Sequence, residues 1–196
     1  QVYRYLDIVS SKVSSEEMCG ISHHLLSLVE PGEDFSVAEY QAQAYTVIDD
    51  IHSREKLPIL AGGTGMYVSA VIKGYEFTDV EPNESLRSEL EGLSVKDLRE
   101  RLLKLSPDTQ LSSSESFNRH RLIRRIEKAA SGISETPKKS PKYESLTIGL
   151  EIGRSELEER IRERVESRLH DGAVEEVEGL RDMILEHFGE NQLEKK

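Results

Sequence analysis

The chain has 196 residues, of which 36% are hydrophobic and 32% charged, and its formal net charge is −11. This length allows one core with a modest subdomain. The sequence has no apolar run of about 18 residues and no charged-then-apolar leader, so it predicts neither a membrane span nor secretion. A single cysteine, Cys19, excludes an internal disulfide and a multi-cysteine zinc site. Together these features indicate a cytoplasmic protein.

The charge is spread unevenly along the chain. The negative total argues against broad, unspecific affinity for nucleic acid. Residues 118–142, however, carry eight Lys or Arg against two acids, whereas residues 151–196 carry fourteen acids against eight bases. Such a local basic block is more informative than the total. It indicates an anion-binding surface inside an acidic protein.

The first third of the chain contains a loop-rich stretch, a helix and a glycine-rich turn. Residues 1–33 are rich in turn-forming residues. A capping box, Ser36-Val37-Ala38-Glu39, then predicts a helix of about 19 residues. The sequence starts without Met, at QVYRYLDIVSSK, and ends in the polar GENQLEKK. We therefore expect a piece of a longer protein.

The turn AGGTGMY joins a short apolar segment to a helical pattern. Residues 57–61 predict a buried parallel strand, and residues 66–73 have helical spacing. Glycines 62 and 63 allow the backbone to approach a ligand, and the helix N-terminus offers N–H groups to a phosphate. From this pattern alone, a phosphate or polar-substrate site and a tight turn without ligand are equally good interpretations.

The rest of the chain predicts a helical region followed by a return to the sheet. Between residues 82 and 143 helices are predicted at 83–91, 94–105 and 115–131. Residues 146–152 (LTIGLEI) predict a second strand.

A second capping box, Ser155-Glu156-Leu157-Glu158, then predicts a helix to about His170, and another follows at 173–188. This order indicates an α/β fold with a parallel sheet. Its core spans residues 1–81 and 144–196, and a helical insertion spans residues 82–143.

The helix predicted at 115–131 has a basic ridge beside its apolar stripe. Arg121, Arg125 and Lys128 recur on one face, and Arg119 and Arg124 flank it. Glutamate 127 is the only nearby acid, which indicates that this face meets an anion such as a nucleic-acid phosphate. An ordinary solvated face is the alternative.

The helix predicted at 155–170 has a regular apolar stripe that we expect to face the core. It consists of Leu157, Ile161, Val165 and Leu169. Arg160, Arg164 and Arg168 recur one position earlier. These arginines either pair with the glutamates at 158, 159, 163 and 166, or one or two of them clamp a phosphate.

The chain contains no G-x-x-x-x-G-K-[ST] loop and no spacing that predicts a metal site. Adjacent His23 and His24 point in different directions, and no third ligand follows at metal spacing. No catalytic triad or carboxylate pair can be argued from spacing alone.

Six stretches in this order resemble the tRNA dimethylallyltransferases, also called tRNA isopentenyltransferases of the bacterial type. They are QVYRYLDI, EEMCGISHHLLSL, FSVAEYQAQA, PILAGGTGMYVSAVIKG, NRHRLIRRIE and LEERIRERVESRLHDGAVEEV. The resemblance implies a P-loop-kinase-like α/β core, which is a nucleotide-binding (ATP-binding) type of fold, with an inserted helical domain that grips the tRNA anticodon stem-loop. The family transfers a dimethylallyl group from dimethylallyl diphosphate to N6 of adenosine 37, and Mg²⁺ assists at the diphosphate.

The resemblance also implies roles for particular residues of this chain. Gln1 would touch the target adenine, and Thr64 would face the reaction centre as the catalytic threonine. Gly62, Gly63 and Arg164 would bind the diphosphate. Positions that match tRNA contacts are Arg87, His120, Arg121, Leu122, Ile123 and Arg124.

Parts of the family pattern are missing from this sequence. They are the phosphate loop, the general-base aspartate of the D-S-x-Q segment that ends at Gln1, and the C-terminal G-Y-R motif. We therefore expect a central fragment with little or no transferase activity, and separately we expect the protein to be a monomer. The alternatives are a non-catalytic RNA-binding remnant and an adenylate isopentenyltransferase. The latter carries GGSNS in place of GGTGM and tends to lack the insertion.

Overall fold

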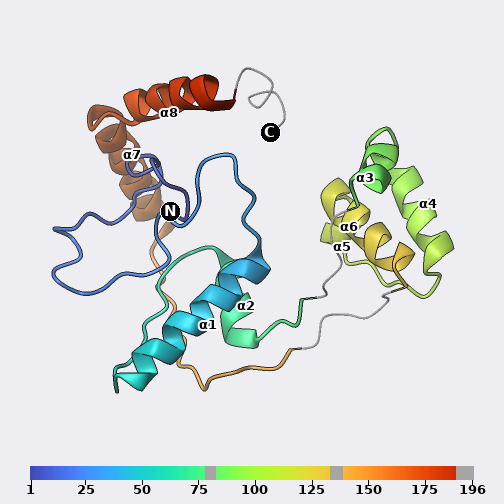
Figure 1. The fold of residues 1–196 in the computed structure, drawn as a ribbon, viewed down its shortest axis with the longest axis horizontal. Helices are drawn as coiled ribbons and strands as arrows, with labels where there is room; N and C mark the ends of the chain where they lie inside the picture. The colour runs from blue at the N-terminus through green and yellow to red at the C-terminus, as the bar shows by residue number, and fades with distance from the viewer. Residues whose placement is uncertain (78–82, 133–138, 189–196) are drawn as a thin grey trace. The chain divides into compact units, whose positions relative to one another are not determined.

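The computed structural model describes residues 1–77, 83–132 and 139–188, and the chain divides into two compact units (Figure 1). One unit comprises residues 1–74 and 141–196, and the other comprises residues 75–140. The helices are α1 (Val37–Ser53), α2 (Gly65–Lys73), α3 (Glu84–Glu91), α4 (Val95–Leu105), α5 (Ser113–Ser116), α6 (Arg119–Ala130), α7 (Arg154–His170) and α8 (Ala173–Phe188). No helix among the described residues is long and apolar enough to cross a membrane.

Helix α1 begins where its capping box predicts. The Ser36 hydroxyl accepts the Glu39 N–H at 3.1 Å, and the Glu39 carboxylate accepts the Ser36 N–H at 2.7 Å. These two bonds satisfy N–H groups that the helix itself leaves without acceptors. Loops fill residues 1–33, as expected, with one isolated bridge between Tyr3 and Val29.

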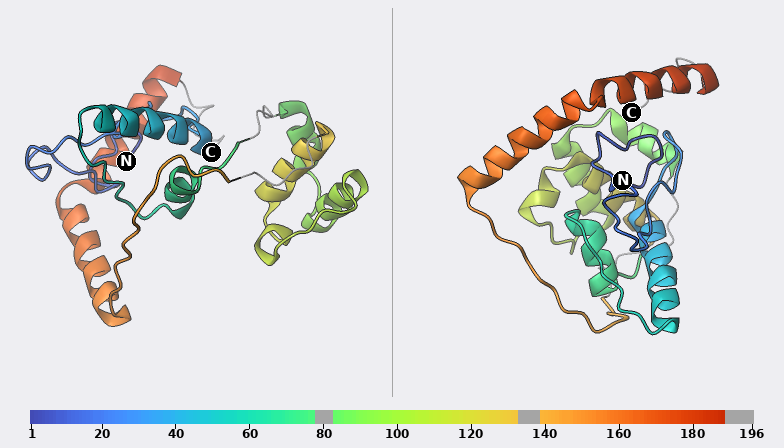
Figure 2. Two further views of the ribbon diagram at one scale, coloured as in Figure 1. Left: turned by 90° about the horizontal axis from the view of Figure 1, so that it is seen from below. Right: turned by 90° about the vertical axis from the view of Figure 1, so that its left-hand side faces the viewer.

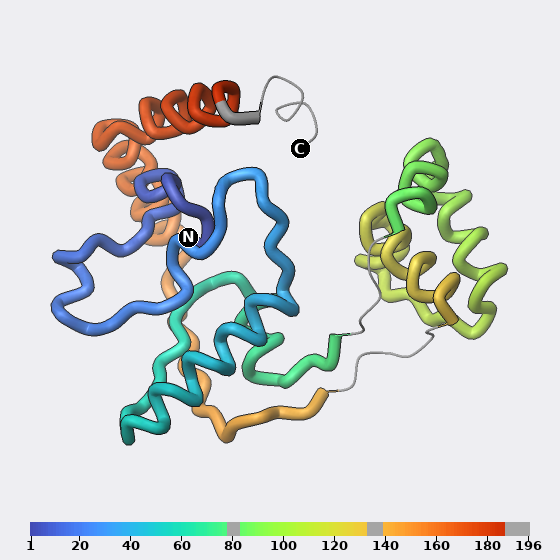
Figure 3. Tube along the Cα trace, viewed as in Figure 1, coloured from blue at the N-terminus to red at the C-terminus, as the bar shows by residue number. Residues whose placement is uncertain are grey.

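The predicted strands at 57–61 and 146–152 are wrong for this structure. Both stretches are extended (Figure 3), but β pairing within the described ranges is limited to two isolated bridges elsewhere. Their apolar side chains are exposed, with Ile59 at 84% and Leu150 at 97%. A strand needs neighbours to pair its N–H and C=O groups, and the described residues supply none at these two stretches.

Two expectations for α7 are also wrong. The helix begins after Gly153 as N-cap, instead of at the capping box of Ser155. Its apolar stripe does not face a core, because Leu157 is 43% and Leu169 55% exposed. No described element covers that stripe, so periodicity alone did not guarantee burial. Gly172, with φ +98°, lies between α7 and α8. The two helices run in different directions (Figure 2, left).

The unit of residues 75–140 is built around an apolar core of helices α3, α4 and α6. The core side chains are Leu90, Leu98, Leu102, Leu122, Ile123 and Ile126. The predicted helix at 115–131 is in fact two helices, because Asn118 caps the start of α6 by accepting the Arg121 N–H at 3.1 Å. The apolar stripe predicted for this region is confirmed as the face that packs against α4 and α3.

Candidate functional site

The glycine-rich turn leads into α2 and is exposed from Ala61 to Gly65. A Cβ atom placed on Gly62, Gly63 or Gly65 would meet no atom of the described chain within 4 Å, so the space beside the turn is open. Thr64 is the N-cap of α2, and its side chain makes no cap hydrogen bond within the described residues. The first N–H groups of α2 therefore face open space and can donate to an anion.

Helix α1 holds α2 in place through three side chains. The Gln41 amide donates to the Ala70 carbonyl at 2.7 Å, and the Tyr45 hydroxyl donates to the Val71 carbonyl at 3.2 Å. Tyr67, the last residue of GGTGMY, stacks on Tyr40 with ring centroids 4.6 Å apart. Burial raises the pKa of Tyr40 and of Tyr67, so both rings are neutral at ordinary pH.

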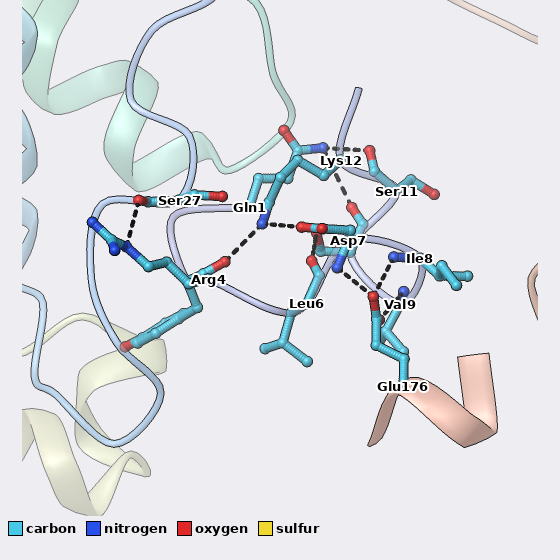
Figure 4. Close-up of polar contacts among 12 residues, drawn as sticks. Gln1, Arg4, Leu6, Asp7, Ile8, Val9, Ser11, Lys12, Ser27 and Glu176 are labelled. Carbon is cyan, nitrogen blue, oxygen red and sulfur yellow. Dashed lines mark hydrogen bonds and ion pairs between the residues drawn. The ribbon is translucent and has the colours of Figure 1, made fainter. Parts of the chain in front are cut away.

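Gln1 is held by the loop that follows it (Figure 4). Its side-chain amide donates to the Ser11 carbonyl at 2.7 Å and to the Ser10 carbonyl at 3.3 Å. Its own carbonyl accepts the Ser27 N–H at 3.0 Å, and Arg4 Nε donates to the Ser27 carbonyl at 3.2 Å. The predicted adenine-contacting residue thus has a defined orientation in this chain.

Two residues far along the sequence hold this loop, and sequence reasoning assigned neither to it. The Glu176 carboxylate of α8 accepts the N–H groups of Asp7, Ile8 and Val9 at 2.6, 2.8 and 2.9 Å (Figure 4). Arg168 of α7 donates from Nε to the Ser11 hydroxyl at 2.8 Å. Glu176 is one of many acids in its region, so no local pattern distinguishes it.

The other α7 arginines lie at the surface. Arg160 forms an ion pair with Glu156 at 2.7 Å. This agrees with the predicted pairing at the surface, but Glu156 is not one of the four glutamates that were expected as partners. Arg164 is exposed, and within the described residues no hydrogen bond or ion pair joins it to Thr64. The structure thus does not link the predicted diphosphate arginine directly to the glycine-rich turn.

In the helical unit, Arg119 serves the end of α3. Its guanidinium donates to the carbonyl of Leu93 at 2.6 Å, to that of Leu90 at 3.0 Å and to that of Glu91. The last carbonyls of a helix lack intrahelical partners, and a cation near them is favourable. Arg119 therefore stabilises the unit and is not part of a free basic ridge.

Arg125 is paired as well, which corrects the expectation that Glu127 is the only acid near the ridge. Its Nη2 lies 2.8 Å from Glu115 Oε1. The hydroxyl and the N–H of Ser112, together with Arg125, lower the pKa of Glu115 to about 2, against a smaller opposing effect of burial. The carboxylate is thus charged over the whole ordinary pH range.

Glu127 is the buried centre of a second network. Its side chain is 1% exposed and accepts Arg87 Nε at 2.8 Å, Arg124 Nη1 at 3.1 Å and the Asn83 N–H at 2.9 Å. Burial alone would raise the pKa of this carboxyl, but the hydrogen bonds from Arg87, Asn83 and Arg124 outweigh it, and the pKa is lowered. Two predicted tRNA-contacting arginines are therefore fixed on one buried anion.

The predicted tRNA-contacting stretch divides by burial. Leu122 is 0% and Ile123 8% exposed, so both side chains lie in the apolar core of the helical unit. His120 and Arg121 are exposed, and Arg121 Nη1 also donates to the Ser114 hydroxyl at 3.1 Å. The exposed side chains at the start of this stretch are thus polar ones.

Among the described residues, no group of three or more His, Cys, Asp or Glu side chains is arranged to hold a metal ion. Mg²⁺ usually needs only one or two carboxylates together with waters and substrate phosphates, so Mg²⁺ stays a prediction of the resemblance.

Residues 1–194 match the model of the IPP transferase family. The chain is 40% identical over 186 residues to the tRNA dimethylallyltransferase of an Exiguobacterium species, which covers 92% of this chain. It is also 40% identical over 195 residues, or 93% of this chain, to the tRNA dimethylallyltransferase of Anoxybacillus flavithermus. The chain belongs to the IPP transferase family, and the resemblance seen in the sequence is confirmed. The chain spans 60% and 62% of the lengths of these two relatives, respectively.

Solved structures agree with this assignment. The crystal structure of the full-length tRNA isopentenylpyrophosphate transferase from Bacillus halodurans superposes with a TM-score of 0.63 at 36% identity, covering 93% of this chain and 59% of that one. A eukaryotic dimethylallyltransferase acting on tRNA gives a TM-score of 0.74 at 24% identity, covering 96% of this chain and 49% of that one, and so shows a shared fold.

Proposed function

We propose that this chain is part of a tRNA dimethylallyltransferase, which transfers a dimethylallyl group from dimethylallyl diphosphate to N6 of adenosine 37. The observation that carries the proposal is the family match over residues 1–194, with relatives of that name at 40% identity. The activity belongs to the whole protein, because the chain spans only about 60% of those relatives. The whole protein would act in the cytoplasm as a monomer.

The helical unit would bind the anticodon stem-loop through exposed arginines and a neighbouring histidine. His120 and Arg121 lie at the surface of α6, and the side chains of Arg87 and Arg124 are 42% and 35% exposed. Phosphate contacts of this kind orient an RNA without reading its sequence. An RNA-binding unit favours a tRNA substrate over the free nucleotide of an adenylate isopentenyltransferase.

The other unit would hold the reacting groups. In the transfer, a bond forms between adenine N6 and the first carbon of the dimethylallyl group, and the carbon–oxygen bond to diphosphate breaks. The diphosphate leaves with the electron pair, and a base takes the N6 proton. The first N–H groups of α2 and Arg164 would stabilise the developing charge on the diphosphate, with Thr64 beside the reacting atoms. A bound Mg²⁺ would add positive charge that favours departure of the diphosphate.

The finer fold of that unit is part of the proposal. In the whole protein, residues 57–61 and 146–152 would be strands of a P-loop-kinase-like parallel sheet. Their apolar composition and high exposure support this, since buried parallel strands are apolar on both faces. The exposed stripe of α7 would then lie against that sheet.

A chimera tests the function directly. Residues 1–196 replace the matching segment of the Exiguobacterium enzyme, and transfer is measured with an A37 stem-loop and with free AMP as acceptors. We expect transfer to the stem-loop only, and loss of transfer in a Thr64→Ala chimera. A folded chimera that prenylates AMP, or one without transfer to either acceptor, would overturn the assignment. The 196-residue chain alone should show no detectable transfer.

A further inference from the structure

The carboxylate of Glu176 has an unusual partner, the backbone of a loop 167 to 169 residues away. Oε1 accepts the N–H groups of Asp7 and Ile8, and Oε2 accepts that of Val9 (Figure 4). Hydrogen bonds to an ionised acceptor are shorter and stronger than neutral ones. One side chain of α8 therefore fixes three consecutive backbone groups of an otherwise irregular segment.

The far side of the same loop holds Gln1. The Ser11 N–H donates to the Ile8 carbonyl at 3.1 Å, which closes the turn, and the carbonyls of Ser10 and Ser11 accept the Gln1 amide. Three hydrogen bonds in series thus connect Glu176 to Gln1 through Ile8 and Ser11, and within the described residues no hydrogen bond joins Glu176 and Gln1 directly.

We propose that Glu176 is a positioning residue: through the turn of residues 7–11 it sets the orientation of the Gln1 side chain toward the target adenine. The proposal rests on the proposed function, in which Gln1 contacts that base. An irregular loop loses order easily, and a small misplacement of a substrate-contacting group costs a large factor in rate. Glu176 supplies the order from a helix that need not touch the RNA.

The matched pair of variants is Glu176→Gln and Glu175→Gln. Each removes one negative charge from the first turn of α8, but only Glu176 bonds the loop. A glutamine at 176 turns an amide donor toward one or two of the three N–H groups, and removes the charge from the remaining bond or bonds.

Nuclear magnetic resonance on the 196-residue chain tests the connection without RNA. In Glu176→Gln we expect amide exchange at residues 7–9 to accelerate at least tenfold. The Gln1 side-chain amide resonances should move toward those of free glutamine, while α1 amides keep their exchange rates. Glu175→Gln should change none of these. Unchanged Gln1 resonances in Glu176→Gln would overturn the inference.

A double-mutant cycle in the chimera tests the catalytic consequence. If Glu176 acts through Gln1, then Glu176→Gln lowers kcat at least tenfold in the Gln1 chimera but has less than a twofold effect in a Gln1→Ala background. Equal losses in both backgrounds would mean a general structural role and would overturn the inference. If Gln1→Ala itself leaves kcat unchanged, the proposed role of Gln1 fails and the inference fails with it. In that case, changed Gln1 resonances in Glu176→Gln would show that Glu176 orders Gln1 without any effect on catalysis.

Discussion

Replacing Glu127 with glutamine should destabilise the helical unit strongly. Glu127 Oε1 accepts Asn83 N–H and Arg87 Nε, whereas Oε2 accepts Arg87 Nη2 at 3.2 Å and Arg124 Nη1. A glutamine that keeps its oxygen at the Oε1 position places an NH₂ donor against two guanidinium donors. Two charge-assisted bonds are then lost, each worth about 1.5–3 kcal/mol.

The loss is smaller than the full sum of those bonds, because both arginines are partly exposed and water recovers some of their solvation. We therefore expect Glu127→Gln to lower the free energy of unfolding of this unit by about 2–3 kcal/mol. Amide exchange at Leu122 and Ile126, measured on the whole chain, should accelerate about 30- to 150-fold.

The matched control is Glu100→Gln on α4. Its carboxylate is 57% exposed and lies 4.0 Å from Lys96, so its removal should change the unfolding free energy by less than about 0.5 kcal/mol. If Glu127→Gln behaved like this control, the carboxylate would not be the anchor of the network, and the reasoning from its burial would be refuted.

Three further changes follow from the same contacts. Arg119→Met keeps the apolar stem but loses three hydrogen bonds to carbonyls. The free energy of opening measured by amide exchange at Leu90 should therefore fall by about 1.5–3 kcal/mol. An unchanged exchange rate would contradict the role of Arg119 at the end of α3. The pKa of Glu115 is about 2 in the fold, below its ordinary 4.5, so it contributes stability above pH 4.5 that is lost as pH falls toward 2. The unfolding free energy of Glu115→Gln, measured with urea, should therefore fall by about 2–3 kcal/mol less than that of the parent as the pH is lowered from 7 to 2. If the two proteins lost the same free energy over this range, the lowered pKa of Glu115 would be refuted. Tyr45→Phe removes the hydrogen bond to Val71, so the free energy of opening of α2 should fall by about 1 kcal/mol. Amide exchange should accelerate in α2 and stay unchanged in α8, and unchanged exchange in α2 would contradict the role of this bond.

The helices were predictable because their signals are local. The capping box at Ser36 lies within four residues, and the apolar stripe of α6 needs only its own 3.6-residue period. The break at Asn118 was missed, although asparagine is a favoured N-cap. Continuous helical spacing across residues 115–131 hid it.

Strand formation depends on residues far away in the sequence. The same holds for which arginines are bonded inside the fold and which stay exposed. Residues 57–61 read as a strand, yet a strand exists only in a ladder, and the described residues provide none there. Arg119 and Arg125 find their acceptors 26 to 29 and 10 residues away, so two arginines of a helix that reads as uniformly basic are engaged inside the helical unit. Glu176 was beyond prediction for the same reason.

The most direct test of the account is whether this chain binds an anticodon stem-loop carrying A36-A37-A38 through α6. The Kd is measured over a salt series for the parent chain, for Arg121→Glu, and for Arg181→Glu, which reverses an exposed charge on α8. We expect the parent chain to bind more weakly as the salt concentration rises. For Arg121→Glu we expect an affinity at least tenfold lower and a slope of log Kd against log salt concentration that is smaller by about one. The Arg181 variant should match the parent. A folded chain that binds no stem-loop, or binds it equally well as Arg121→Glu, would contradict the claim that the helical unit is the RNA-binding part of the protein.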